Sequence, residues 1–328
     1  MNVAAFTSGD VDFASSRMRS FYIFQSRIWK KHNIAFNPCI YSIHKFHCIH
    51  IQKKFTLNFI LVAIFSRILG KMVVFDIDDQ AQKKLHKIAV FIMVVVSSMV
   101  TTDTCTRKKY LKKITRKKAI YVIPDVLDED GALTPRRYKD ESSKIRLTKN
   151  TVILWVGNAD NYNSFRHIIE LDSKLAKYEV LIITDLLKGR NISLDHPNYS
   201  IKQWSNDWRK KLKFDCDYYM VLNHNDPEDK NSVYKSENKM LTAICSYIVP
   251  IVSDTYSYRL LAKSINAEYL VFNKYNSVYD IISKVKSNGV EWRKEFLVNS
   301  YNFIYKKYNA EAISTKLLKK MNDVYKYD

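Results

Sequence analysis

The chain has 328 residues, of which 47% are hydrophobic, and this content allows a sizeable core and excludes a disordered chain. Lysine and arginine number 53 against 33 acidic residues, which gives a formal net charge of +20. Residues 1–150 hold most of the surplus, with 27 basic and 12 acidic residues. This favours an anionic partner such as a membrane face, nucleic acid or an acidic glycan. A genome that favours lysine codons explains the same surplus without any partner.

The cysteines and the apolar runs bear on where the protein works. The five cysteines form no CxxC pair and are odd in number, which is typical of reduced thiols in a cytosolic protein. The start MNVAAFTSGD lacks the basic residues and long apolar core of a signal peptide. Two apolar runs, 55–69 and 88–100, are interrupted by polar residues or shorter than the roughly 20 residues of a spanning helix. We therefore expect a cytoplasmic protein without a membrane span.

In the first half of the chain, short apolar strands alternate with helical segments. Predicted strands cover 2–9, 46–52, 72–79, 97–102 and 119–126. Predicted helices begin near Ser16 and cover 56–69, 80–95 and 104–114. Gly70 is suited to a helix stop, and either Asp103 or Thr104 to the N-cap of the last of these helices. This spacing is typical of βαβ units in a parallel sheet.

The pattern restarts after a charged segment, 136–150, which we interpret as a linker. Predicted strands then cover 151–158, 179–185, 199–204, 217–223, 248–254 and 268–273, and predicted helices cover 162–178, 205–214, 237–246, 256–264, 277–287 and 291–321. The fold class is therefore α/β, with an N-terminal domain at 1–135 and a C-terminal domain at 151–300. A C-terminal helix, 301–328, could pack back on the first domain.

The order of these segments resembles a GT-B glycosyltransferase, in which two Rossmann-like domains face each other across a cleft. The resemblance spans nearly the whole chain and rests on SSRMRS, IHIQKK and VVFDIDD in the first domain and on ILWVGN, QWSNDW, FDCDYYMVLN and KSENKMLTAICSYIVPIVSD in the second. It is most similar to bacterial enzymes of cell-surface polysaccharide assembly. The sequence departs from the family at Thr242, where many retaining members carry a Glu, and at 157–160, where many members carry an Arg and a Lys.

The resemblance implies transfer of a sugar from a nucleotide-sugar donor to a glycan or lipid-linked acceptor, with no cofactor. The enzyme would be cytoplasmic and peripheral on the inner face of the cell membrane, where an anionic surface is the expected partner and nucleic acid is not. The same layout would suit transfer of glycerol phosphate or ribitol phosphate. The charge alone would suit a non-enzymatic protein that binds nucleic acid or a membrane.

The donor is expected at the start of the helix 237–246, where free N–H groups and a partial positive charge suit a diphosphate. Lys239 would pair with phosphate, and Glu237 or Thr242 would accept hydrogen bonds from ribose or sugar hydroxyls. Further residues predicted to line this pocket are Ser236, Asn238, Gly157, Asn158 and Asn223, with His224 and Asn225. A plain N-cap at Ser236 and an ordinary turn at Gly157 are the alternatives.

On the acceptor side, Asp78 and Asp79 follow a strand and are the candidate catalytic residues. One of them would deprotonate the acceptor hydroxyl if the enzyme inverts configuration, whereas helix capping needs Asp79 alone. Arg17 and Arg19 are candidates for phosphate or acceptor binding because the guanidinium offers a fork of donors. Lys53 and Lys54 are weaker candidates of the same kind.

Two further features concern metals and membranes. The histidines at 44, 47 and 50, with Cys48, lack the paired spacing of a structural zinc site, so no metal is expected. His50, near a strand end, is expected to face the cleft. The basic run 107–118 carries apolar residues beside its charges, which suits an anionic membrane surface, although a solvated helix face explains it equally simply.

Overall fold

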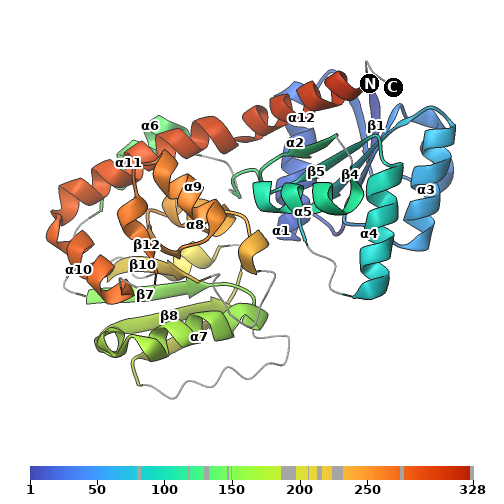
Figure 1. Ribbon diagram of the computed structural model, residues 1–328. Helices are drawn as coiled ribbons and strands as arrows, with labels where there is room; N and C mark the ends of the chain where they lie inside the picture. The colour runs from blue at the N-terminus through green and yellow to red at the C-terminus, as the bar shows by residue number, and fades with distance from the viewer. Residues whose placement is uncertain are drawn as a thin grey trace. The chain divides into compact units, whose positions relative to one another are not determined.

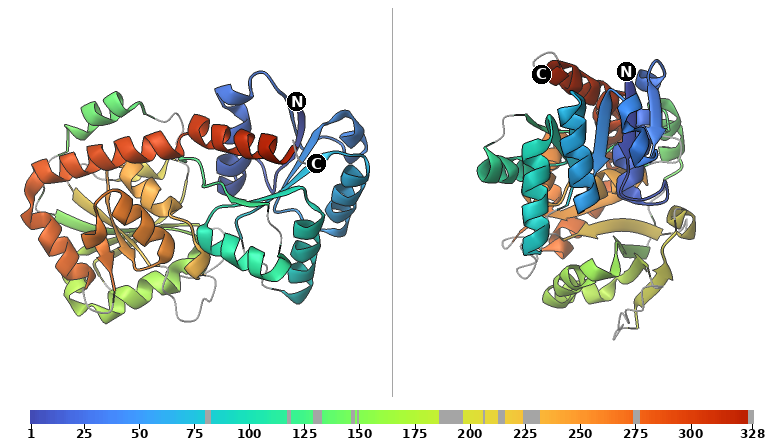
Figure 2. Two further views of the ribbon diagram at one scale, coloured as in Figure 1. Left: turned by 45° about the horizontal axis from the view of Figure 1, so that its top comes forward. Right: turned by 90° about the vertical axis from the view of Figure 1, so that its right-hand side faces the viewer.

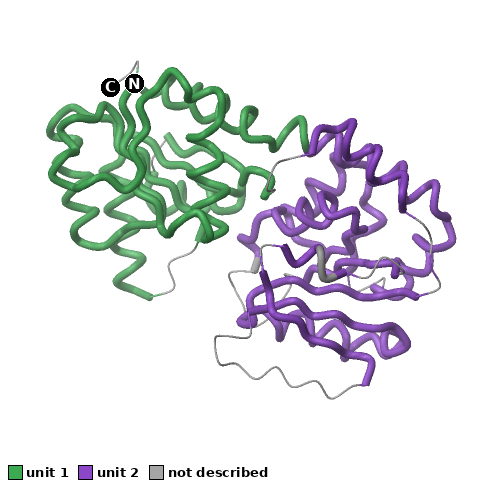
Figure 3. Tube along the Cα trace, turned by 180° about the vertical axis from the view of Figure 1, so that it is seen from behind, with its two compact units in different colours: residues 1–132, 305–328 green, residues 133–304 purple. Residues whose placement is uncertain are grey.

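The computed structural model describes residues 1–79, 83–116, 119–128, 133–145, 148, 150–185, 197–205, 207–212, 216–223, 232–273 and 277–325. The chain divides into two compact units, which Figure 3 distinguishes by colour. Unit 1 comprises residues 1–132 and 305–328, and unit 2 comprises residues 133–304. Each unit contains a six-stranded sheet whose paired strands all run parallel.

The sheet of unit 1 has the strand order β2-β1-β3-β4-β5-β6. Its strands are β1 (Asn2–Phe6), β2 (Asn33–Phe36), β3 (Cys48–Gln52), β4 (Met72–Ile77), β5 (Met99–Thr102) and β6 (Ile120–Val122). The central strands are apolar on both faces, as is usual for parallel strands covered by helices on either side. In the register, Ala5 lies opposite His50, which in turn lies opposite Val74.

Helices cover both faces of this sheet (Figure 2). On one face, α3 (Leu57–Ile68), α4 (Lys84–Val96) and α5 (Cys105–Thr115) pack on the strand residues whose side chains point to that side. The other face is covered by α2 (Tyr22–Gln25) and α12 (Ala310–Tyr325). The short α1 (Ala14–Ser16) and the π-helical η1 (Arg17–Phe21) lead into α2. Successive strand residues alternate between the two cores, so Ile49 belongs to the first and Cys48 to the second.

The sheet of unit 2 has the order β12-β11-β10-β7-β8-β9 (Figure 1). Its strands are β7 (Asn150–Val156), β8 (Glu179–Thr184), β9 (Tyr199–Gln203), β10 (Cys216–Leu222), β11 (Val249–Ser253) and β12 (Val271–Phe272). Its helices are α6 (Pro135–Ser142), α7 (Tyr162–Leu171), α8 (Asn238–Cys245), α9 (Tyr256–Ser264), α10 (Val278–Ser287) and α11 (Gly289–Tyr308). The last turn of α11 already belongs to unit 1.

The parallel α/β architecture predicted from the sequence is confirmed, and the local chemistry at helix ends explains several boundaries. Thr104 is the N-cap of α5, and its side chain accepts a hydrogen bond from the backbone N–H of Arg107. Gly70, with a φ of 67°, follows α3 in the left-handed conformation that glycine adopts without strain. Among the described residues, none of the helices has the length and apolar content needed to cross a membrane.

Several boundaries differ from the prediction. The strand β2 was not predicted, and the predicted helix 291–321 is two helices, α11 and α12. The segment 136–150 holds most of α6, whose Tyr138 is fully buried between the rings of Tyr247 and Tyr301. The part of this segment that forms α6 is therefore packed in unit 2 and is not a linker. The division between the units falls at 132/133, and residues 305–328 are grouped with unit 1.

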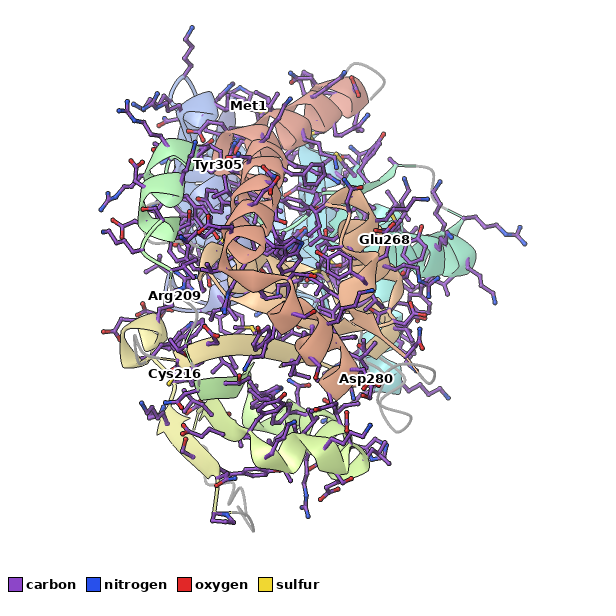
Figure 4. The ribbon with its side chains drawn as sticks, turned by 90° about the vertical axis from the view of Figure 1, so that its left-hand side faces the viewer. Met1, Arg209, Cys216, Glu268, Asp280 and Tyr305 are labelled. Atoms are coloured by element: carbon purple, nitrogen blue, oxygen red, sulfur yellow. The ribbon has the colours of Figure 1, made fainter. Side chains whose placement is uncertain are left out.

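The predicted helix 205–214 is also wrong, because the described part of that segment forms only the 3-10 turn η7 (Trp208–Lys211). Trp208 is buried, which holds this turn in place. Arg209, labelled in Figure 4, donates a hydrogen bond from Nε to Ser246 Oγ at 2.7 Å. Ser246 follows the last residue of α8, so the turn is attached to the C-terminal end of that helix.

Candidate functional site

The strand order of unit 2 places a topological switch point between β7 and β10. From β7 the chain proceeds outward through β8 to β9, and then returns to β10 and proceeds the other way through β11 to β12. In doubly wound sheets of this kind, ligands bind in the crevice that opens at the carboxyl ends of the strands at the switch point. Gly157 lies directly after β7, and α8 follows β10, so both belong to this crevice.

Lys239 and Gly157 are in direct contact at this place. A Cβ atom at position 157 would lie 2.8 Å from Lys239 Nζ and 2.8 Å from Trp155 Cζ2. Real Cβ atoms do not approach other atoms so closely, so any side chain at position 157 would displace the end of the lysine side chain and the Trp155 ring. The ammonium group also lies over the Trp155 ring, 5.4 Å from its centroid. Lys239 therefore extends from the first turn of α8 across the end of β7.

The surroundings of Lys239 disfavour the charged form of its side chain. Burial, and to a smaller extent the nearby charge of Lys235, lower the pKa of Lys239 to about 8. The residue lies in the first turn of α8, where the helix N-terminus also carries a partial positive charge. A cation held in this way gains stability when an anion binds beside it. The geometry thus suits a phosphate group at the switch point.

The other predicted donor residues around α8 are brought to the same helix end. Glu237, not Ser236, is the N-cap, and its backbone carbonyl accepts hydrogen bonds from Met240 and Leu241 at 2.9 and 3.1 Å. Asn238 is the first helical residue, and its carbonyl accepts a hydrogen bond from the Thr242 hydroxyl at 3.0 Å. Thr242 thus donates within the helix, and only its oxygen lone pairs could take part in ligand binding.

Asn158 and Asn223 fix the protein's own loops. Asn158 is the N-cap of η4 (Ala159–Asn161), and its Oδ1 accepts the backbone N–H of Asp160 at 3.1 Å. Asn223 is buried and donates from Nδ2 to the carbonyl of Ser164 at 2.7 Å, which holds α7 against the end of β10. Both residues border the switch point. Their hydrogen bonds hold the backbone segments next to it in place. His224 and Asn225 lie outside the described residues.

Unit 1 has its own switch point, between β1 and β3, and a polar cluster lies at it. From β1 the chain proceeds to β2 on one side and then to β3 on the other. Gln52, at the end of β3, is buried and donates from Nε2 to the Ser15 carbonyl at 2.9 Å and to Ser15 Oγ at 3.0 Å. Its Oε1 accepts from the Ser20 hydroxyl at 3.2 Å. The loop after β1 is thereby held against the end of β3.

Lys53 connects this cluster to the two candidate catalytic carboxylates. Its Nζ lies 2.9 Å from Asp78 Oδ1 and 2.7 Å from Asp79 Oδ2. Asp78 also accepts a hydrogen bond from the Ser15 hydroxyl at 2.6 Å. The Asp78 side chain is only 11% exposed, whereas that of Asp79 is 68% exposed. The fold therefore gives the two carboxylates different surroundings: Asp78 is enclosed and held, and Asp79 reaches solvent.

The backbone at Lys53 is unusual, because its φ of 53° lies in the left-handed region that residues other than glycine rarely adopt. The backbone N–H of Lys53 donates to the Asp76 carbonyl at 2.9 Å, which keeps the residue beside β4. Such conformations often occur at functional sites, where the surrounding structure enforces them. Lys53 was only a weak candidate in the sequence analysis. The acidic residues Asp78 and Asp79 after the next strand could have indicated that a lysine pairs with them here.

Structural comparison places this arrangement among solved proteins. The Anabaena protein HepE in complex with UDP-glucose superposes with a TM-score of 0.63 at 12% identity, covering 98% of this chain and 100% of HepE. An alpha-glucosyltransferase in complex with UDP and DNA gives 0.62 at 9% identity, with 98% and 99% covered. Sucrose-phosphate synthase from Thermosynechococcus elongatus gives 0.57 at 10% identity, with 87% and 75% covered. The chain has a GT-B fold.

At the level of sequence, neither a protein-family model nor a curated protein matches the chain. The GT-B fold is thus shown by structure, and the resemblance stated from the sequence motifs is confirmed at the level of the fold. At these identities the likeness concerns the fold alone. The roles of individual residues have to be argued from the contacts of this chain.

Within the GT-B fold, Arg19 is part of the interior of unit 1 and not of a phosphate site. Its Nε and one terminal nitrogen donate to the two carboxylate oxygens of Asp76 at 2.8 and 2.6 Å, and the other donates to Asp125 at 2.8 Å. Only 2% of the residue is exposed. Arg17 is similarly paired with Asp128, at 2.7 and 2.8 Å. Both predictions of ligand binding are corrected, because these guanidinium groups tie the loop after β1 to the chain after β6.

His50 is the second correction on the acceptor side. It is 1% exposed and packs edge-on against the Phe24 ring, with the centroids 5.0 Å apart. Burial lowers the pKa of His50 to about 4, although the nearby Asp76 opposes this shift. The side chain is therefore neutral at physiological pH and is enclosed beside Phe24 of the second core of unit 1. No trio of metal-ligating side chains occurs within the described ranges.

The basic run 107–118 is partly a structural element of the GT-B fold. Arg107 is buried and paired with Asp103, and Leu111 is buried against the first core of unit 1. Residues 117 and 118 lie outside the described residues. The exposed basic residues of α5 are Lys109, Lys112 and Lys113, followed by Arg116 after the helix end. One face of this helix is therefore solvated and strongly basic.

Proposed function

We propose that the protein is a glycosyltransferase that transfers a sugar from a nucleotide-sugar donor. The observation that carries the proposal is the Lys239 ammonium group, which is partly desolvated and lies across Gly157 at the switch point of unit 2. The solved structures of HepE and of the alpha-glucosyltransferase contain UDP-glucose and UDP, respectively, on the same fold. This supports a nucleotide-sugar as the donor class. We propose in addition that the transfer needs no cofactor.

The donor diphosphate would lie between the N-terminus of α8 and the end of β7. There its oxygens would pair with the Lys239 ammonium group and accept hydrogen bonds from the free backbone N–H groups of the first turn of α8. In the transfer, the bond between the anomeric carbon and the phosphate oxygen breaks, and its electron pair leaves with the nucleoside diphosphate. Lys239 is placed to stabilise the negative charge that develops on this leaving group. Glu237 is the candidate for the hydroxyl groups of the ribose or sugar.

The acceptor would be activated in unit 1, at the end of β4. We assign the general-base role to Asp79, because its carboxylate reaches solvent while Asp78 is held by Lys53 and Ser15. If configuration is inverted, the acceptor hydroxyl gives its proton to Asp79 as its oxygen bonds to the anomeric carbon. Asp78 and Lys53 would position Asp79. We propose a glycan or lipid-linked acceptor of cell-surface polysaccharide biosynthesis, which the motif resemblance supports, and a cytoplasmic protein at the inner membrane face.

A melting scan against UDP-, GDP-, CDP- and CMP-sugars tests the donor assignment, because a ligand that binds the native state raises the midpoint. We expect one nucleotide class to raise the midpoint and to be hydrolysed slowly or transferred. Lys239→Ala and Glu237→Ala should lose this response, while Lys263→Ala, at an exposed lysine of α9, should keep it. Equal responses in all three variants would refute the donor site, and no response of the native chain to any nucleotide-sugar would refute the function.

A further inference from the structure

The outward face of α3 and α4 carries an exposed apolar surface. On α3 and directly after it, Leu57, Leu61, Phe65, Ile68 and Leu69 are exposed, and on α4, Leu85, Ile88, Phe91 and Val95 are exposed. The exposed fractions of these nine residues run from 42% to 78%. The inward faces of both helices are also apolar and are buried in the first core of unit 1. A helix that is apolar on all sides is normally covered on all sides.

The nine residues form one surface, which we call the α3–α4 face. Along α3, residues 57, 61, 65 and 68 follow helical spacing and lie in a stripe, and residues 88, 91 and 95 do the same on α4. The two helices pack against each other, and Figure 2 shows them side by side on the same side of the sheet. Monomeric soluble proteins expose scattered apolar residues, whereas a continuous surface of this kind marks a site of interaction.

The charges around the α3–α4 face are all of one sign. The helices α3, α4 and α5 contain no aspartate or glutamate. At the N-terminal end of α4, Lys83, Lys84 and Lys87 are exposed, and α5, which packs against α4, exposes Lys109, Lys112 and Lys113. The nearby acids of unit 1 are neutralised within the chain, since Asp103 pairs with Arg107, and Asp78 and Asp79 pair with Lys53. The apolar surface thus has a basic border.

We propose that the α3–α4 face docks onto an anionic lipid bilayer. Both helices would lie flat in the interface, with their exposed stripes among the acyl chains and the bordering lysines at the anionic headgroups. A second copy of this chain fits less well, because its own basic border would lie opposite the first. Nucleic acid would match the charge but would leave the apolar stripes in water. The inference does not depend on the proposed reaction, because it rests on a different surface.

Vesicle flotation with the full chain tests the proposal. The probes are vesicles of phosphatidylcholine alone and vesicles that contain about one third phosphatidylglycerol. We expect binding to the anionic vesicles to exceed binding to the neutral ones at least tenfold and to weaken at high salt. Phe65→Glu combined with Phe91→Glu should reduce anionic-vesicle binding at least tenfold. The matched control, Leu171→Glu with Leu260→Glu, adds the same charges at exposed leucines of unit 2 and should bind like the native chain.

A second pair of variants separates the apolar and the basic contributions. Lys112→Gln with Lys113→Gln should weaken binding to anionic vesicles, and Lys263→Gln with Lys284→Gln, at exposed lysines of unit 2, should not. Thermal melts check that each variant is folded. Equal vesicle binding by Phe65→Glu/Phe91→Glu and its control would overturn the proposal. So would a native dimer that this variant dissociates, which would assign the face to self-association, or binding to DNA fragments without binding to anionic vesicles.

Discussion

The proposed donor site depends most on Lys239, whose surroundings disfavour the charged form of its side chain. We therefore expect this charge to destabilise the fold when no ligand is bound. Because burial lowers the pKa of Lys239 to about 8, keeping it charged costs the folded protein free energy below that pH. This cost decreases as the pH rises above 8, and it is recovered when an anion binds. Such a lysine strengthens the binding of an anion but lowers the free energy of unfolding of the protein without ligand.

Replacing Lys239 by methionine, which is one atom shorter but unbranched and removes the charge, tests this expectation. At pH 7 the unliganded variant should unfold at the same temperature as the native protein or higher. The charge is worth up to about 3 kcal/mol of destabilisation, at roughly 1.4 kcal/mol per unit of pKa shift. The same variant should lose at least tenfold in nucleotide-sugar affinity by calorimetry. Lys263→Met is the control, and a variant that melts lower yet binds normally would contradict the assignment.

Donor binding should also be coupled to protonation. A nearby diphosphate raises the pKa of Lys239 from about 8, so the complex takes up a fraction of a proton at pH 8 and almost none at pH 6.5. Calorimetric titrations in two buffers of different ionisation enthalpy measure this uptake. The affinity should be constant at low pH and should fall as the pH rises above 8. Lys239→Met should show neither effect, and proton uptake that persists in this variant would point to another group.

The sequence predicted that Arg19 binds a ligand, but its side chain pairs with Asp76 and Asp125 in the interior. Replacing it should therefore reduce stability and not ligand binding alone. Burial alone would raise the pKa of Asp76, but the Arg19 guanidinium holds it below its usual range. Arg19→Met leaves Asp76 and Asp125 without this partner in the interior, so we expect a loss of about 3–5 kcal/mol in denaturant unfolding. The exposed Arg137→Met should cost less than about 0.5 kcal/mol. A stable Arg19→Met protein with weakened ligand binding would restore the original prediction.

Among the secondary-structure elements, apolar runs and turn signals in the sequence located most of the strands and longer helices of both units. The strand β2 was missed because it is a four-residue strand at the sheet edge, and none of its residues is fully buried. The ends of α11 and α12 were missed because both carry helical periodicity up to their junction at Asn309. The sequence predicted the helix α8, but the contact between Lys239 and Gly157 depends on the sheet order, which periodicity does not determine.

The helix α12 packs on unit 1 and completes its second core. Ile313, Leu317 and Met321 are buried in it, and the Ser314 hydroxyl donates to the Ile23 carbonyl at 2.8 Å. Leu317→Ala should therefore cost about 2–5 kcal/mol. Hydrogen exchange should show the loss of protection in β1 and β3, while β7 and β10 keep theirs. Lys319→Ala, at an exposed position on the same helix, should leave both patterns unchanged, and equal losses in both units would contradict this packing.

At the scale of the whole molecule, both candidate sites occur where the connectivity of a sheet reverses. Unit 1 reverses between β1 and β3, where Lys53 and the cluster around Gln52 lie, and unit 2 reverses between β7 and β10. The sequence indicated two α/β domains and placed a helix after the fourth strand of the second, where α8 lies. It could not indicate that Arg17, Arg19 and His50 are internal, because their burial depends on strand ends that are distant in the sequence.

The discontinuity of unit 1 has a consequence for how the chain is made on the ribosome. Residues 1–132 emerge first, but α12, which covers Val3, Ile23 and Met72 in the second core, is translated only after all of unit 2. Unit 2 is continuous in sequence and can therefore fold during synthesis, before unit 1 is complete. Proteolysis of ribosome-bound chains in which residue 304 is followed by a linker long enough to clear the exit tunnel should accordingly cleave within residues 1–132 and spare unit 2. Equal resistance of both units at that length would show that unit 1 folds without its final helix.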